Sequence, residues 1–113
     1  MKVNQSAVLS QGLEAEARKL GAALARLRIA RGMKQEQTAL RAGVSRNTAY
    51  RLEKGDAGVA MGQVLRYLDA IVPGKTLLEL LSGTDPALAA LGAKEQRRRA
   101  SALSKSELDE IDF

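Results

Sequence analysis

Apolar residues recur every three or four positions through much of the chain, which predicts helices. The first stripe predicts one long helix over about 10–31, with Gly32 ending it; its members are Leu9, Leu13, Ala17, Leu20, Leu24 and Leu27. Another stripe predicts a helix over about 61–71, formed by Met61, Val64, Leu65, Leu68 and Ile71. Residues 1–8 are expected to be a frayed lead-in.

Between these stripes the sequence predicts two short helices, which begin at Gln35 and Arg46 and are joined by a tight turn. Gly43 can adopt the left-handed backbone conformation that ends the first. Ser45 can cap the second, because its hydroxyl can accept a free backbone N–H. At about 100° per residue, the second helix presents one polar face, made of Arg46, Asn47, Tyr50, Arg51 and Lys54. Its opposite face, suited to a core, holds Thr48, Ala49 and Leu52.

The stretch QEQTALRAGVSRNTAYRLEKG over residues 35–55 resembles the Cro/repressor (XRE) family of helix-turn-helix transcription factors. The resemblance covers about residues 20–71 and rests on Gln35, Ala39, Gly43-Val44-Ser45 and Leu52-Glu53-Lys54-Gly55. Two positions depart from the family pattern: Thr38 stands where leucine is usual, and Ala49 where isoleucine, leucine or valine is usual. We expect the volume left there to be filled by Leu40, Tyr50 or Met61.

The expected fold is all-α: a five-helix Cro/repressor-like helix-turn-helix domain with an extended first helix and a C-terminal tail. We expect a helical extension over 1–19, the DNA-binding domain over 20–83 and a tail over 84–113 that is partly helical or disordered. Thr76 and Glu79 fit a capping box that begins the closing helix, and Asp85-Pro86 can open another. The extension can form a dimer contact or pack against the protein's own C-terminal segment.

Composition argues against enzymatic chemistry. The 113 residues include no cysteine and no histidine, so disulfides, thiolate metal sites and the commonest general base are excluded. We found no paired carboxylates, glycine-rich phosphate loop or nucleophile motif, and we expect no enzyme, metal or cofactor. No apolar run approaches the roughly 20 residues of a membrane span, and a signal-peptide core is lacking. We expect a cytoplasmic protein that does not bind membranes.

Positive charge is concentrated around the predicted turn. The net charge is +5, but residues 18–54 hold ten basic and two acidic side chains, which gives this segment +8 and the remainder −3. Such a focused field is typical of a surface that binds phosphate groups.

Side-chain chemistry assigns candidate roles on double-stranded DNA. Arg46 or Arg51 can donate two hydrogen bonds to the O6/N7 edge of guanine, and Asn47 can pair similarly with adenine. The resemblance implies a phosphate contact for Gln35, whose place at a helix N-terminus favours an anion. The complete set of candidate backbone contacts is Gln35, Ser45, Thr48, Tyr50, Lys54, Arg28 and Arg31.

The expected function is a bacterial, sequence-specific transcriptional regulator, more often a repressor, that binds an inverted-repeat operator as a homodimer or higher even oligomer. Dimer contacts can come from the segments 9–20, 77–81 or 88–91. The alternative is an antitoxin that neutralises a partner toxin protein and autoregulates its operon. Apolar residues among charges in the tail suit a protein partner at 84–113; they are Leu103, Leu108, Ile111 and Phe113.

Overall fold

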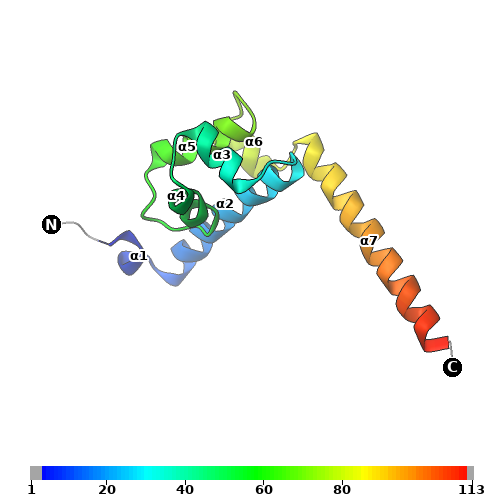
Figure 1. Cartoon of the computed structure of the whole chain (residues 1–113). Coiled ribbons are helices and arrows are strands. Elements are labelled where there is room, and N and C mark those ends of the chain that lie inside the picture. Colours follow the sequence, from blue (N-terminus) through cyan, green and yellow to red (C-terminus); the bar gives the residue numbers. More distant parts are fainter. Residues whose placement is uncertain (1–3, 112–113) are drawn as a thin grey trace.

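The computed structural model describes residues 4–111, without the side chains of Ser6 and residues 104–111. The described chain is all-helical, as predicted. Its helices are α1 (Gln5–Val8), α2 (Gln11–Ala30), α3 (Gln35–Ala42), α4 (Arg46–Glu53), α5 (Met61–Ile71), α6 (Leu77–Ser82) and α7 (Pro86–Ile111). Helices α2–α6 form one bundle, which corresponds to the predicted five-helix domain, and α7 projects from it as a long rod (Figure 1).

Local capping explains where the helices begin. The Ser10 hydroxyl accepts the Leu13 N–H at 3.2 Å, so the extended first helix starts directly after Ser10. Upstream of it, the frayed lead-in expected for residues 1–8 is wrong for residues 5–8, because the Asn4 carbonyl accepts the Ala7 N–H and closes the short helix α1. Residues 1–3 lie outside the described part of the chain.

The core is aliphatic except for one tyrosine. Its members are Leu24, Leu27, Ala39, Ala42, Ala49, Leu52, Tyr67, Leu68, Ile71 and Leu80. Tyr67, from α5, is the largest side chain that is fully buried. Thr38 is also fully buried, and its hydroxyl donates to the Lys34 carbonyl at 3.0 Å, so this polar group has a partner inside the bundle.

The expectation that Leu40, Tyr50 or Met61 fills the core beside Thr38 and Ala49 is wrong. These three side chains are exposed, at 83%, 54% and 72% of their surface respectively. The largest fully buried side chains belong instead to α2 and α5, and include Leu24, Leu27, Tyr67 and Leu68.

Helices α2 and α4 approach each other backbone to backbone where α4 ends. A Cβ atom at Gly21 would lie 2.5 Å from the Gly55 nitrogen and 2.6 Å from the Leu52 carbonyl oxygen. Gly55 itself has φ +77° and lies against the Ala17–Arg18 backbone of α2. The absence of side chains at both glycines therefore fixes the end of α4 against α2.

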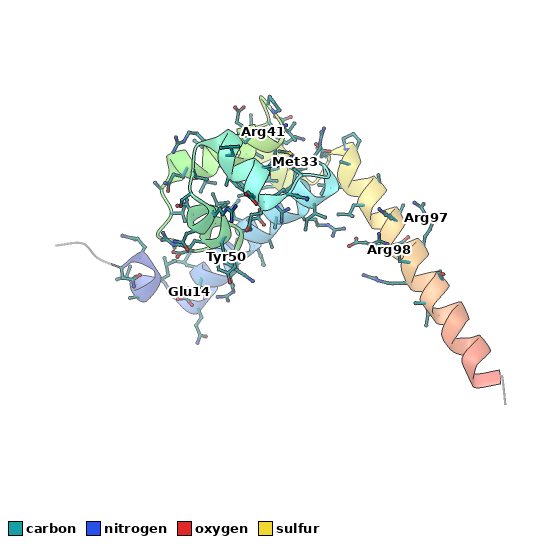
Figure 2. All side chains as sticks on the ribbon, viewed as in Figure 1. Glu14, Met33, Arg41, Tyr50, Arg97 and Arg98 are labelled. Atoms are coloured by element: carbon teal, nitrogen blue, oxygen red, sulfur yellow. The ribbon has the colours of Figure 1, made fainter. Side chains whose placement is uncertain are left out.

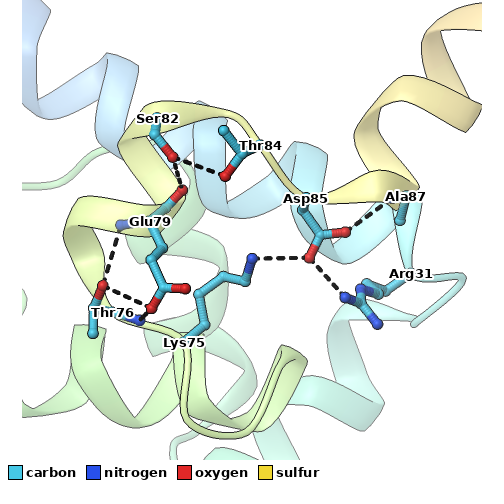
Figure 3. Close-up of polar contacts among 8 residues, drawn as sticks. All are labelled: Arg31, Lys75, Thr76, Glu79, Ser82, Thr84, Asp85 and Ala87. Carbon is cyan, nitrogen blue, oxygen red and sulfur yellow. Dashed lines mark hydrogen bonds and ion pairs between the residues drawn. The ribbon is translucent and has the colours of Figure 1, made fainter.

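Helix α6 begins as predicted, with the Thr76–Glu79 capping box. Figure 3 shows the polar contacts that then join α7 to the bundle. Asp85, whose side chain is 2% exposed, accepts hydrogen bonds from Arg31 at 2.6 Å and from the Ala87 N–H at 2.9 Å, and Lys75 lies 3.0 Å away. These donors, with the Arg31 hydrogen bond as the largest effect, lower the pKa of Asp85 from 3.8 to about 2.

Helix α7 leaves the bundle after this junction. Glu95 still pairs with Arg26 of α2 at 2.7 Å, whereas every residue from 96 to 103 is exposed. The N-terminal part of α2 and the far end of α7 lie at opposite ends of the molecule (Figure 1). The alternative in which the extension packs against the C-terminal segment is therefore contradicted, and the extension instead borders the loop after α4.

Candidate nucleic-acid interface

The turn between α3 and α4 has the geometry that the sequence predicts. Gly43 has φ +70°, its N–H donates to the Leu40 carbonyl at 3.2 Å, and the Val44 N–H donates to the Ala39 carbonyl at 3.0 Å. This pair of bonds ends α3 in a left-handed glycine cap. Ser45 then accepts the Thr48 N–H at 3.0 Å through its hydroxyl, so α4 starts directly after the turn.

Helix α4 has one anchored face and one free face. Ala49 and Leu52 are buried in the core, at 0% and 3% exposure. The opposite face is exposed and consists of Arg46, Asn47, Tyr50 and Lys54. Figure 2 shows Tyr50 projecting from α4, well separated from Arg97 and Arg98 on α7. The free face therefore presents long hydrogen-bond donors on a rigidly held short helix.

Two borders of this face carry half-buried groups. Thr48 accepts a hydrogen bond from the Ser45 hydroxyl at 2.9 Å, so both hydroxyls take part in the N-cap of α4. On the other border, Arg51 donates from Nε to Oδ2 of Asp56 at 2.8 Å, and Asp56 Oδ1 accepts the Gly58 N–H at 2.7 Å. The Arg51–Asp56 hydrogen bond raises the pKa of Arg51 and lowers the pKa of Asp56.

The exposed polar side chains of the free face differ in their interaction partners. Arg46 forms an ion pair through Nη2 with Glu36 of α3. The Lys54 ammonium lies 5.5 Å from the centroid of the Tyr50 ring, a cation–π arrangement that keeps the two side chains together. Asn47 is exposed, and its amide has no hydrogen-bond partner among the described residues.

Gln35 occupies the first position of α3, as expected, and is half-buried. Lys34, directly before it, is exposed and has no carboxylate partner in the described part of the chain. Sequence reasoning did not include Lys34 among the candidate phosphate contacts, although a lysine beside a helix N-terminus was visible in the sequence.

Two candidate backbone contacts are engaged elsewhere. Arg28 forms a buried ion pair with Glu53, with Nε–Oε2 at 2.6 Å and Nη2–Oε1 at 3.0 Å, and only 14% of its side chain is exposed. Its Nη1 donates to the Met33 carbonyl at 2.8 Å, and the Glu53 hydrogen bonds raise its pKa. Arg31 pairs with Asp85 at 2.6 Å. Both arginines are thus paired with carboxylates within the fold, and their assignment to phosphate binding stays a prediction.

Most basic side chains of this segment lie close to a carboxylate, some of them in exposed surface pairs. Seven of the ten basic side chains in residues 18–54 lie within 4.0 Å of a carboxylate: Arg18, Lys19, Arg26, Arg28, Arg31, Arg46 and Arg51. Lys34, Arg41 and Lys54 have no carboxylate partner among the described residues. The unpaired positive charge of this segment thus comes from α3, its entry and the end of α4.

Comparison with known proteins agrees with this geometry. A family model described as a helix-turn-helix domain matches residues 19–81, which is more than half of the chain and includes both α3 and α4. No curated protein and no solved structure matched the chain. Within the described residues, no helix combines the length and the apolar character needed to cross a membrane. The chain belongs to the helix-turn-helix domain family, a family typical of XRE-like DNA-binding regulators.

Proposed function

We propose that the protein is a sequence-specific transcriptional regulator that binds an inverted-repeat operator as a homodimer, with repression as its mode of action. The observation that carries this proposal is the free face of α4, where Arg46, Asn47, Tyr50 and Lys54 are exposed while Ala49 and Leu52 anchor the helix. A short helix held this way fits the major groove. Repression then needs only an operator that overlaps a promoter.

The proposed contacts follow from the chemistry of each side chain. Arg46 and Arg51 donate to guanine and Asn47 pairs with adenine, each contact discriminating against a wrong base by about 1–3 kcal/mol. Phosphate contacts set the register of the protein without selecting sequence. We assign them to Lys34 and Gln35 at the start of α3, and to Ser45, Thr48, Tyr50 and Lys54 on α4.

Exposed leucines on α6 support dimerisation. Leu78 and Leu81 are 79% and 64% exposed and lie three residues apart, so they share one side of the helix. Leu81 also borders a groove lined by Ala23, Leu80 and Leu88. We assign the dimer interface to this surface. A two-fold dimer would read two half-sites about 34–36 Å apart.

A second candidate function, that of an antitoxin, is favoured by α7. Residues 96–103 of this helix are all exposed, and the helix extends away from the bundle (Figure 1). Leu103 is 64% exposed, although it is apolar. A helical segment that is exposed over this length is suited to bind a partner protein, in this case a toxin, while α4 binds the operator for autoregulation.

The test is in vitro selection of genomic DNA fragments on the purified full-length protein at near-physiological salt. We expect enrichment of an inverted repeat, and loss of this enrichment in an Arg46→Ala/Arg51→Ala double variant. The control is an Arg97→Ala/Arg98→Ala/Arg99→Ala variant, which removes three charges far from α4 and should weaken binding evenly on all sequences. Enrichment that is absent in the wild-type protein would contradict the proposal. A partner captured through α7 without any DNA preference would favour the second candidate.

A further inference from the structure

We propose that Asp56 is a positioning residue that orients Arg51 to read a guanine, an inference that rests on the proposed function above. Asp56 lies in the turn that follows α4 and is absent from the DNA contacts that the sequence predicts. Its carboxylate accepts the hydrogen bond that the Arg51 guanidinium donates.

The carboxylate of Asp56 is itself fixed on both sides. Oδ1 accepts the Gly58 N–H at 2.7 Å, and Oδ2 accepts Arg51 Nε at 2.8 Å. In addition, the Asp56 N–H donates to the Arg51 carbonyl at 3.0 Å, so backbone and side chain both tie the turn to the last part of α4. The adjacent Gly55 lies against the α2 backbone. Asp56 is therefore held on a rigid support.

The choice of the donor atom on Arg51 decides what the guanidinium can still do. Of its five N–H groups, Asp56 takes the one on Nε. The terminal groups Nη1 and Nη2 have no hydrogen-bond acceptor among the described residues. These two groups form the pair of parallel donors that matches O6 and N7 of guanine. The Asp56 contact thus restricts the side chain while it leaves the base-reading edge available.

The ion pair between Arg46 and Glu36 differs from the Arg51–Asp56 pair in the donor atom that it uses and in its exposure. Glu36 binds Nη2, one of the terminal donors that a guanine would need, and both side chains are largely exposed, at 76% and 66%. Arg51 and Asp56 are only 39% and 32% exposed. Glu36 therefore competes with DNA for Arg46, whereas Asp56 holds Arg51 without occupying its terminal donors. This contrast gives a matched control within the same interface.

The expected effects of substitution follow from this difference. Asp56→Ala frees Arg51 to reach phosphates on any sequence, so the ratio of operator affinity to random-DNA affinity should fall about tenfold, with loss of the guanine preference at one base pair. Asp56→Asn keeps an oxygen acceptor without the charge and should give an intermediate ratio. Glu36→Gln removes a competitor for Arg46 and a negative charge, so affinity should rise on both DNAs, and the ratio of operator affinity to random-DNA affinity should not fall.

The experiment measures binding of the full-length protein by fluorescence anisotropy, on the selected operator, on its single-base-pair variants and on random duplex DNA. The proteins are wild type, Arg51→Ala, Asp56→Ala, Asp56→Asn and Glu36→Gln, each checked for helicity by circular dichroism. If Asp56→Ala fails to fold, Asp56→Asn carries the comparison. A guanine preference that is lost in Arg51→Ala and reduced in the Asp56 variants at the same base pair supports the proposal.

Three other results would overturn it. If Asp56 variants retain the wild-type guanine preference that Arg51→Ala loses, the positioning role fails while the proposed function stands. The same holds if these variants gain affinity on operator and random DNA alike, since Asp56 would then only mask a charge. If wild type itself shows no preference for any sequence, the proposed function fails, and the positioning role fails with it.

Discussion

At the scale of single residues, the Glu53 carboxylate is the centre of a buried polar cluster. It accepts hydrogen bonds from Arg28 Nε and Nη2 and from the Tyr67 hydroxyl, and its side chain is only 7% exposed. A buried charge is tolerated when hydrogen bonds offset its desolvation. Burial, followed by the Glu53 contact, raises the pKa of Tyr67, so its hydroxyl stays protonated and donates. The cluster joins α2, α4 and α5 at the end of the proposed DNA-reading helix.

Tyr67→Phe should therefore lower the free energy of unfolding by about 1–2 kcal/mol, because it removes one donor to a buried carboxylate without changing the shape of the core. Urea unfolding followed by circular dichroism measures the change. Tyr50→Phe is the matched control, since Tyr50 is 54% exposed and lies on the free face of α4; its effect should stay within about 0.5 kcal/mol. Equal effects of the two variants would contradict a structural role for the Tyr67 hydroxyl.

The arrangement of side chains on α4 could be predicted from sequence because it depends on neighbours within one short helix. The ion pairs that Arg28 and Arg31 form could not be predicted in this way. Their partners, Glu53 and Asp85, lie 25 and 54 residues away along the chain. A sequence segment shows how many charges it holds, but the fold decides which of them are paired.

At the scale of helices, the crossing of α2 and α4 at Gly21 leaves no room for a side chain. Gly21→Ala should lower the free energy of unfolding by about 2 kcal/mol or more, because the new methyl group meets the backbone of residues 52–55. Gly62→Ala is the control: this glycine lies in α5, and an added Cβ would meet no atom within 4 Å. It should stabilise the protein by up to about 1 kcal/mol by restricting the unfolded chain. A thermal or urea titration distinguishes the opposite signs, and the same sign for both would refute the close crossing.

The assignment of the dimer interface to α6 is tested at the same scale. Leu78→Glu/Leu81→Glu introduces charge on the exposed side of α6 and should yield monomers in sedimentation velocity, with weaker operator binding. Val8→Glu/Leu13→Glu changes the exposed apolar residues of the N-terminal extension, which are 61% and 57% exposed. This second variant should remain dimeric. Dissociation of the second variant alone would move the interface to the extension.

Helix boundaries were largely predictable because the caps are local: the Ser10, Ser45 and Thr76 hydroxyls each accept a backbone N–H at the start of a helix. The C-terminal region offered a weaker pattern. Residues 93–111 are mostly polar and lack an apolar stripe, so periodicity alone did not distinguish a helix from disorder there. Their alanine, arginine, lysine, glutamate and leucine content nevertheless favours a helix through intrinsic propensity, and α7 spans this segment.

At the scale of the whole molecule, acidic residues outside the basic segment fold back onto it. Asp56, Asp85 and Glu95 pair with Arg51, Arg31 and Arg26 respectively. The +8 obtained by counting residues 18–54 therefore overstates the field that DNA would meet. Two of these pairs, Arg31–Asp85 (Figure 3) and Arg26–Glu95, also attach α7 to the bundle. The same contacts therefore neutralise charge and place the C-terminal helix.

This attachment should depend on pH through Asp85. Its pKa is lowered from 3.8 to about 2 by Arg31, the Ala87 N–H and Lys75, so its contribution to stability is full above about pH 4 and is lost as the pH falls toward 2. Asp85→Asn should cost about 1–2 kcal/mol at pH 7, and the difference between wild type and variant should shrink between pH 4 and 2. Urea unfolding of both proteins at several pH values measures that difference. The other carboxylates are the same in both proteins, so their contributions to the pH dependence cancel. A difference that stays constant down to pH 2 would show that the ionised carboxylate does not hold α7 to the bundle.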